Sequence, residues 1–361
     1  MRHAAVFLLA AMLLAMPAAA ESDMAGELGI DELENSLPAE AAEIYGSLEA
    51  DSGSFGEKLS SLLDWLSEHS LPVLRSAVAS ALAMMAILLL STAAQSLTGG
   101  KAPDFVRFGA SLGIAAVAAG DLGSFIGLGE QTIQSLADFG ALLLPCMAAA
   151  MAAAGNAASG GAIYAATALF LNLLLTLSSA VLMPLIKVYI AAVTARSALG
   201  TSALNTAVTF TKWLCVTAMT VLVVAFTTYF SVTGAIAAGG DAAAARVART
   251  AIAAALPVVG RIVSGAAGTV VAGAAMLRSG VGVLGLLAVM AVCAAPFLTL
   301  GVHYVVYKAA AVLAEGLDGG ESGKLIGGLG TAFGMVMGLV GCGAIMLFLA
   351  MVSSMKAVSP L

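Results

Sequence analysis

LIGGLGTAFGMVMGLVGCGAIMLFLAM, residues Leu325 to Met351, runs for 27 positions without a charged side chain. A helix needs about 20 predominantly apolar residues to cross the hydrocarbon core of a bilayer, so this stretch predicts a transmembrane helix. Four other apolar runs exceed that length with almost no charge and predict further spans. They are Ala77–Leu97, Ala162–Ile186, Trp213–Ala238 and Val281–Val302.

The overall composition indicates the same class of protein. Charged residues make up 10% of the 361 positions, apolar residues 61%, and the mean hydropathy is +1.03. A soluble domain carries roughly 25% charged residues, so an ordinary soluble enzyme is excluded. The four cysteines lie far apart in apolar stretches, which excludes a CxxC motif or a zinc-site spacing. With only three histidines and 6% aromatic residues, we expect no metal and no other cofactor.

The N-terminus has the features of a secretory signal. Arg2 and His3 precede the apolar run Ala4–Met16, and Ala18–Ala20 provide a cleavage pattern of small residues. The apolar run is too short to span a bilayer, so we expect removal of residues 1–20 rather than a first transmembrane helix. The chain then divides into an acidic exported region, residues 21–70, and a multispan membrane domain, residues 71–361.

The acidic region is expected to be helical and outside the bilayer. It holds 13 of the 21 acidic residues of the chain and one lysine, Lys58. Its apolar residues follow helical spacing and form a stripe on one face. The stripe comprises Phe55, Leu59, Leu62, Leu63 and Leu66. It either packs on the membrane domain as part of an amphipathic hairpin or docks a partner, with Phe55, Leu59, Leu63 and Leu66 as the docking residues. The acidity opposes binding of nucleic acid or anionic lipid.

Two weaker apolar stretches, Phe105–Gly120 and Ala251–Leu277, bring the expected total to about seven spans. Phe139–Ala154 is interpreted as re-entrant or interfacial, and residues 187–212 as an interfacial helix or a plain cytoplasmic loop. From an exported N-terminus, this arrangement places an excess of lysine and arginine inside, as the positive-inside rule requires. It puts the C-terminus inside and Asp121, Glu130 and Asp138 in an outside loop. The predicted fold is an all-α, polytopic membrane protein.

Small residues repeat at four-residue intervals in three places. These are Gly330, Gly334 and Gly338; Gly109 and Gly113; and Ser264 and Gly268. This spacing puts the small residues on one helix face, where a neighbouring backbone can approach closely. The faces therefore predict helix packing, either within one chain or between copies in a homo-oligomer.

Arg261 follows Pro257 by four residues in a small, apolar segment and is a candidate functional position. A lone arginine at membrane depth is costly and needs water, an acid or the interface. Every acid after Glu68 is expected in a loop or at a span end, so snorkelling near Pro257 is favoured over a conduction role. The string GVGVLG at 280–285 lacks the strand and acid of a dinucleotide site. The sequence shows no nucleophile–base pair, paired-carboxylate site or P-loop, so we expect a protein that is not an enzyme.

The segment ALPVVGRIVS at 255–264, with Thr269-Val270-Val271 after it, resembles the stage III sporulation protein AE family of endospore-forming bacteria. The resemblance extends through Ala311–Gly316 and the glycine-rich last span, and so covers nearly the whole mature chain.

This resemblance implies a mother-cell protein of the outer forespore membrane, within a secretion-like channel complex that joins mother cell and forespore. Its implied partners are other stage III sporulation membrane proteins and a cytoplasmic ATPase. The alternative is a secondary transporter or permease that binds a small solute, since Pro257, Arg261 and Asn172 are polar or irregular features within spans.

Overall fold

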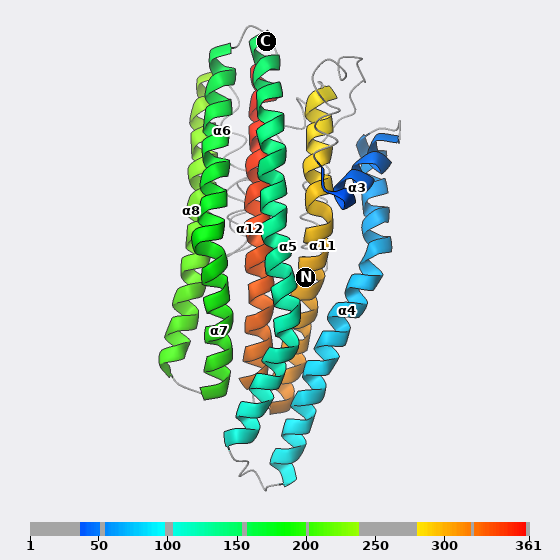
Figure 1. Ribbon diagram of the computed structural model, residues 1–361, viewed down its shortest axis with the longest axis vertical. Coiled ribbons are helices and arrows are strands. Elements are labelled where there is room, and N and C mark those ends of the chain that lie inside the picture. The colour runs from blue at the N-terminus through cyan, green and yellow to red at the C-terminus, as the bar shows by residue number, and fades with distance from the viewer. Residues whose placement is uncertain are drawn as a thin grey trace.

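A computed structural model describes residues 37–50, 55–97, 104–153, 157–199, 202–237, 280–318 and 321–358. Every regular element in these ranges is helical (Figure 1). The helices are α3 (Ala39–Ala50), α4 (Phe55–Leu97), α5 (Asp104–Ala153), α6 (Ala157–Leu177), the π-helical turn η2 (Ser178–Leu182), α7 (Met183–Leu199), α8 (Ser202–Ala237), α11 (Gly280–Asp318) and α12 (Glu321–Val358). The predicted all-α fold is confirmed.

Six helical segments are long and apolar enough to cross a membrane, which supports a multi-pass membrane protein. They are Ser60–Leu97, Phe105–Pro145, Thr167–Leu199, Leu204–Tyr229, Gly285–Leu317 and Ser322–Met351. The further span expected over 251–277 lies outside the described residues, as does the signal segment. Many large apolar side chains remain exposed on the outer faces of these helices, as lipid contact requires.

Helix α12 occupies the centre of the bundle. It contacts α5, α6, α7, α8 and α11, and 72% of its most apolar stretch is buried, against 22% for α4. Helix α11 lies antiparallel beside it and also contacts α3, α4 and α5. The run that is most continuously apolar in the sequence is thus the one enclosed by other helices.

Helix α5 corrects the interpretation of residues 105–154. A single helix of 50 residues replaces the expected short span, acidic outside loop and re-entrant segment. Asp121, Glu130 and Asp138 therefore lie along a helix that contains a candidate span, and the expectation that they occupy an outside loop is wrong. The acids are too widely spaced to stop a helix, and Pro145 is accommodated within it.

Residues 187–212 also differ from expectation. The described residues of this range do not form one separate helix or one loop: those up to Leu199 complete the segment that starts in α6, and those from Ser202 begin α8. Basic residues in this region find partners on neighbouring helices. Lys187 lies 3.7 Å from Glu130 of α5, and Arg196 donates to the backbone carbonyl of Lys324 on α12.

The six long segments alternate in direction, so the first and last of them share an end of the bundle. Helix α4 begins and α12 ends at the same end, where α8 also ends and α11 also begins (Figure 1). The expected placement of the acidic region and the C-terminus on opposite sides of the membrane does not fit these helices. The six described segments, if each crosses once, make an even number of crossings and return α12 to the side on which α4 begins.

Candidate functional site: a polar cluster inside the helix bundle

A hydrogen bond between α5 and α11 forms the centre of a buried polar cluster. The hydroxyl of Tyr307 donates to a carboxylate oxygen of Asp121 at 2.7 Å. Tyr307 is fully buried and Asp121 is partly buried, although both lie within candidate membrane spans. Ionisable groups at such positions are costly in an apolar environment, so their pairing across two helices marks a candidate functional site.

His303 lies one helical turn from Tyr307 and is 2% exposed. Its Nδ1 is 2.9 Å from the carbonyl oxygen of Thr299, and a carbonyl can only accept, so Nδ1 carries the proton. Its Nε2 is buried and has no hydrogen-bond partner among the described residues. The imidazole packs between Phe125 of α5, with ring centroids 4.4 Å apart, and Phe333 of α12, at 5.6 Å.

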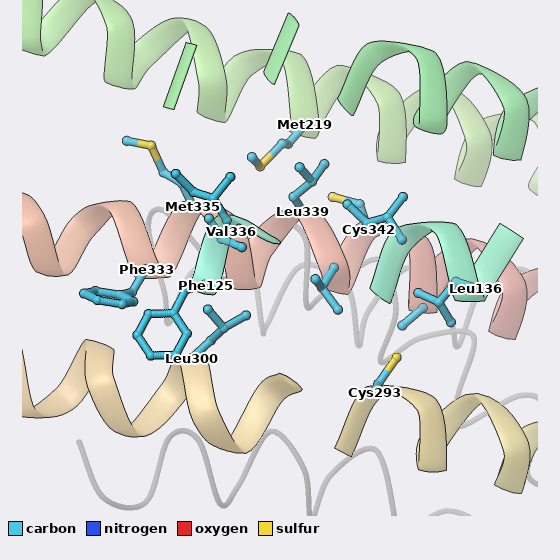
Figure 2. Close-up of a cluster of buried hydrophobic side chains, with 14 of the residues drawn as sticks. Phe125, Leu136, Met219, Cys293, Leu300, Phe333, Met335, Val336, Leu339 and Cys342 are labelled. Atoms are coloured by element: carbon cyan, nitrogen blue, oxygen red, sulfur yellow. The ribbon is translucent and has the colours of Figure 1, made fainter. Parts of the chain in front are cut away.

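The aromatic rings join the polar cluster to the apolar core. Phe333 contacts Phe125 and Tyr307 edge-on, with centroid distances of 4.9 and 4.8 Å. Figure 2 shows Phe125 and Phe333 converging with Leu300 between α5, α11 and α12. Three helices thus meet where the polar and apolar side chains adjoin.

Lys308 provides the basic group of the cluster. Its Nζ donates to the carbonyl oxygen of Gly327 at 2.6 Å and to Oγ1 of Thr331 at 2.8 Å, both on α12. The ammonium also lies 5.9 Å from the Tyr304 ring centroid. Lys308 therefore links α11 to α12, as Tyr307 links α11 to α5.

The predicted glycine row of α12 lies against two different helices. A Cβ added at Gly330 would lie 3.1 Å from Cβ of Tyr307, and one at Gly334 would lie 3.0 Å from the Tyr304 ring. Gly338 instead faces Met219 of α8, with 3.7 Å to its sulfur.

Two further glycines continue the contact of α12 with α11. Gly327 faces Ala311 at 3.3 Å and Gly341 faces Phe297 at 3.4 Å. As the residue number rises along α12, the number of the α11 partner falls by nearly equal steps, which is the register of an antiparallel helix pair.

The other predicted packing positions have different surroundings. A Cβ added at Gly109 would meet no atom within 4 Å, whereas one at Gly113 would lie 3.3 Å from Ile87 of α4. Ser264 and Gly268, together with Pro257 and Arg261, lie outside the described residues.

The stripe of the acidic region has a partner within the chain. Leu62 is 2% exposed, and Trp65 and Leu66 are partly buried against the main apolar cluster. Helix α3 contacts both α4 and α11 and buries Ile44 completely. Phe55, Leu59 and Leu63 lie on α4, but their side chains are outside the described set.

No group of three histidine, cysteine or acidic residues suited to a metal ion occurs among the described residues. Cys215, Cys293 and Cys342 are buried free thiols on three different helices. The described side chains of the polar cluster are joined across helices by hydrogen bonds and ring contacts.

A family model described as stage III sporulation protein AE matches residues 48–357. The chain belongs to this family. The match extends from α3 through nearly all of α12 and therefore includes the polar cluster and nearly the whole described bundle. The sporulation family resemblance drawn from the residues is confirmed, and the chain is a multi-pass sporulation membrane protein.

One relative of this sporulation family is stage III sporulation protein AE of Bacillus subtilis strain 168. It is 28% identical over 199 residues, which is 54% of this chain and 49% of the relative. The chain thus aligns with about half the length of that curated relative. No solved structure matches the chain.

The polar cluster is a feature that the sequence alone did not predict. The element boundaries expected around Asp121 place it in a loop rather than on a long helix. The sequence does contain one signal of the cluster. Asp121 and Phe125 are separated by one helical turn, and so are His303 and Tyr307. Sequence spacing defines each pair but does not indicate that they face one another.

Proposed function

We propose that this member of the stage III sporulation protein AE family is a non-enzymatic integral subunit of a secretion-like channel complex that links mother cell and forespore. The observation that carries the proposal is the family match over nearly the entire described bundle. In support, the buried polar groups of that bundle hydrogen-bond across helices, which suits a structural subunit.

The proposed location is the outer forespore membrane of the mother cell, with residues 21–70 exported after removal of residues 1–20. The proposed partners are other stage III sporulation membrane proteins and a cytoplasmic ATPase. Gly330 and Gly334 are proposed to pack helices within the chain, because α11 covers both of them. Copies of the chain in a homo-oligomer would therefore have to contact one another through a surface other than Gly330 and Gly334.

The alternative is a secondary transporter that binds a small solute. One observation favours it: Asp121, Tyr307 and His303 gather inside the bundle, where transporters place polar groups for substrates or coupling ions. Against it, the Asp121 carboxylate and the Lys308 ammonium already hydrogen-bond to groups on neighbouring helices.

Purification from sporulating cells tests the two functions. A channel subunit should co-purify with other stage III sporulation membrane proteins under mild detergent, and it should show no saturable binding of small solutes. An isolated chain with saturable solute binding would overturn the channel proposal in favour of the transporter.

A further inference from the structure

One outer face of α5 carries polar and small side chains where a membrane helix ordinarily presents large apolar ones. We call it the α5 polar face. It consists of Gly123, Ser124, Glu130, Gln131, Gln134 and Asp138, all of which are exposed. At about 100° of rotation per residue, the six positions fall within roughly 120° of the helix circumference and so form one stripe, which rises over roughly 22 Å.

Apolar residues bound this stripe at both ends. Leu112 is 46% exposed before it and Leu142 is 38% exposed after it, and no large apolar side chain of α5 between them is exposed. The other long helical segments expose leucine, valine, phenylalanine or tryptophan along their spans, for example Leu82, Leu173 and Val224. The α5 polar face is therefore an interruption within an otherwise apolar exterior.

The charged side chains at this face are exposed on the surface of the bundle. The side chains of Glu130 and Lys187 are 46% and 57% exposed, and Oε1 and Nζ are 3.7 Å apart. At that separation the pair is too loose to satisfy the donors and acceptors of both groups. Nearby, the Gln134 amide donates to Asp138 at 2.8 Å on the exposed surface. Hydrocarbon chains can supply no further hydrogen bonds to these groups.

We propose that the α5 polar face lines an aqueous passage in the assembled channel and contacts water and hydrated polar solutes. Water can complete the hydrogen bonding of the Glu130–Lys187 pair without requiring a partner of fixed shape. A Cβ placed at Gly120 or Gly123 would have no atom within 4 Å, so no other described part of the chain fills the space beside α5 at these two positions. Other subunits provide the remaining walls. This inference rests on the proposed channel function.

Cysteine labelling in membranes of sporulating cells tests this inference. Single cysteines are introduced at Gln131 and Gln134 in a full-length chain whose four native cysteines are alanine. Val188→Cys is the matched control, because Val188 adjoins Lys187 in the chain and is 55% exposed. A membrane-impermeant thiosulfonate should modify Gln131→Cys and Gln134→Cys at least tenfold faster than Val188→Cys, since lipid protects the control site.

Two results would overturn the inference. Slow labelling at all three positions would mean that lipid or a dry protein contact covers the α5 polar face. Equally fast labelling at all three would mean that this level of the bundle lies outside the hydrocarbon core. Co-purification with the other sporulation proteins is measured on the same samples. Partner recovery with slow labelling therefore rejects the passage alone, whereas failure of the chain with its native cysteines, purified in parallel, to recover partners rejects the channel function itself.

Discussion

Tyr307 of α11 and Asp121 of α5 are 186 positions apart in the chain, and a 2.7 Å hydrogen bond joins their side chains. The bond joins the first half of the bundle to the α11–α12 hairpin. Because α5 and α11 run in opposite directions, the same register brings Phe125 against His303 one turn away. A polar and an aromatic contact thus fix the relative height of the two helices.

Removal of the Tyr307 hydroxyl should destabilise the bundle. Tyr307→Phe leaves the Asp121 carboxylate without this donor. A fully buried unpaired acceptor costs about 1–3 kcal/mol, and because Asp121 is partly buried we expect a loss near the lower end of that range. Asp121→Asn is the matched control, since its amide oxygen still accepts from Tyr307. Thermal unfolding of the detergent-solubilised protein checks both variants. A Tyr307→Phe variant with the melting temperature of the parent would show that this bond contributes nothing to the fold.

Labelling of intact non-sporulating cells that carry the protein in their cell membrane should place the acidic region and the C-terminus on the same side of that membrane. A cysteine at Glu43 and a cysteine added after Leu361 should react together with an impermeant reagent, because α4 begins and α12 ends at one end of the bundle. A cysteine at Arg196, at the other end, should react only after the cells are permeabilised. Labelling of the first two sites from opposite sides would contradict the arrangement of the six segments.

A large side chain at Gly330 should force α11 away from α12. Gly330→Leu places atoms against Cβ of Tyr307 and near the backbone nitrogen of Lys308, neither of which can rotate aside. Overpacking of this kind typically costs about 1–3 kcal/mol. Gly109→Leu is the control, since no atom lies within 4 Å of the added Cβ. Equal melting temperatures for the two variants would argue against close packing at Gly330.

Truncation of Leu62 should test whether the acidic region packs on its own membrane domain. Leu62→Ala removes a side chain that is 2% exposed, and such changes cost about 2–5 kcal/mol. Leu71→Ala, at a position that is 59% exposed on the same helix, should have little effect. Limited proteolysis and thermal unfolding provide the measurements. If Leu62→Ala melts like the parent but no longer recovers sporulation partners, this surface docks a partner instead.

Several features of the fold could be read directly from the residues. The charge-free run from Leu325 to Met351 predicted a membrane helix because its length and apolarity suffice by themselves. Resemblance along the chain identified the family without any knowledge of contacts. The limits of α5 were missed because short apolar stretches separated by Asp121 and Asp138 look like separate elements. In the folded chain the Asp121 carboxylate accepts a hydrogen bond from Tyr307 and that of Asp138 accepts one from Gln134.

The sequence by itself determined the helical membrane class and the positions of small residues along α12, because both follow from composition and local spacing. Only the tertiary structure decided that Gly330 faces Tyr307, that Asp121 meets Tyr307, and that Glu130 meets Lys187 on an exposed face. Each of these contacts depends on the relative height and rotation of two helices. Those two quantities are set by the packing of all the helices together, and no local pattern encodes them.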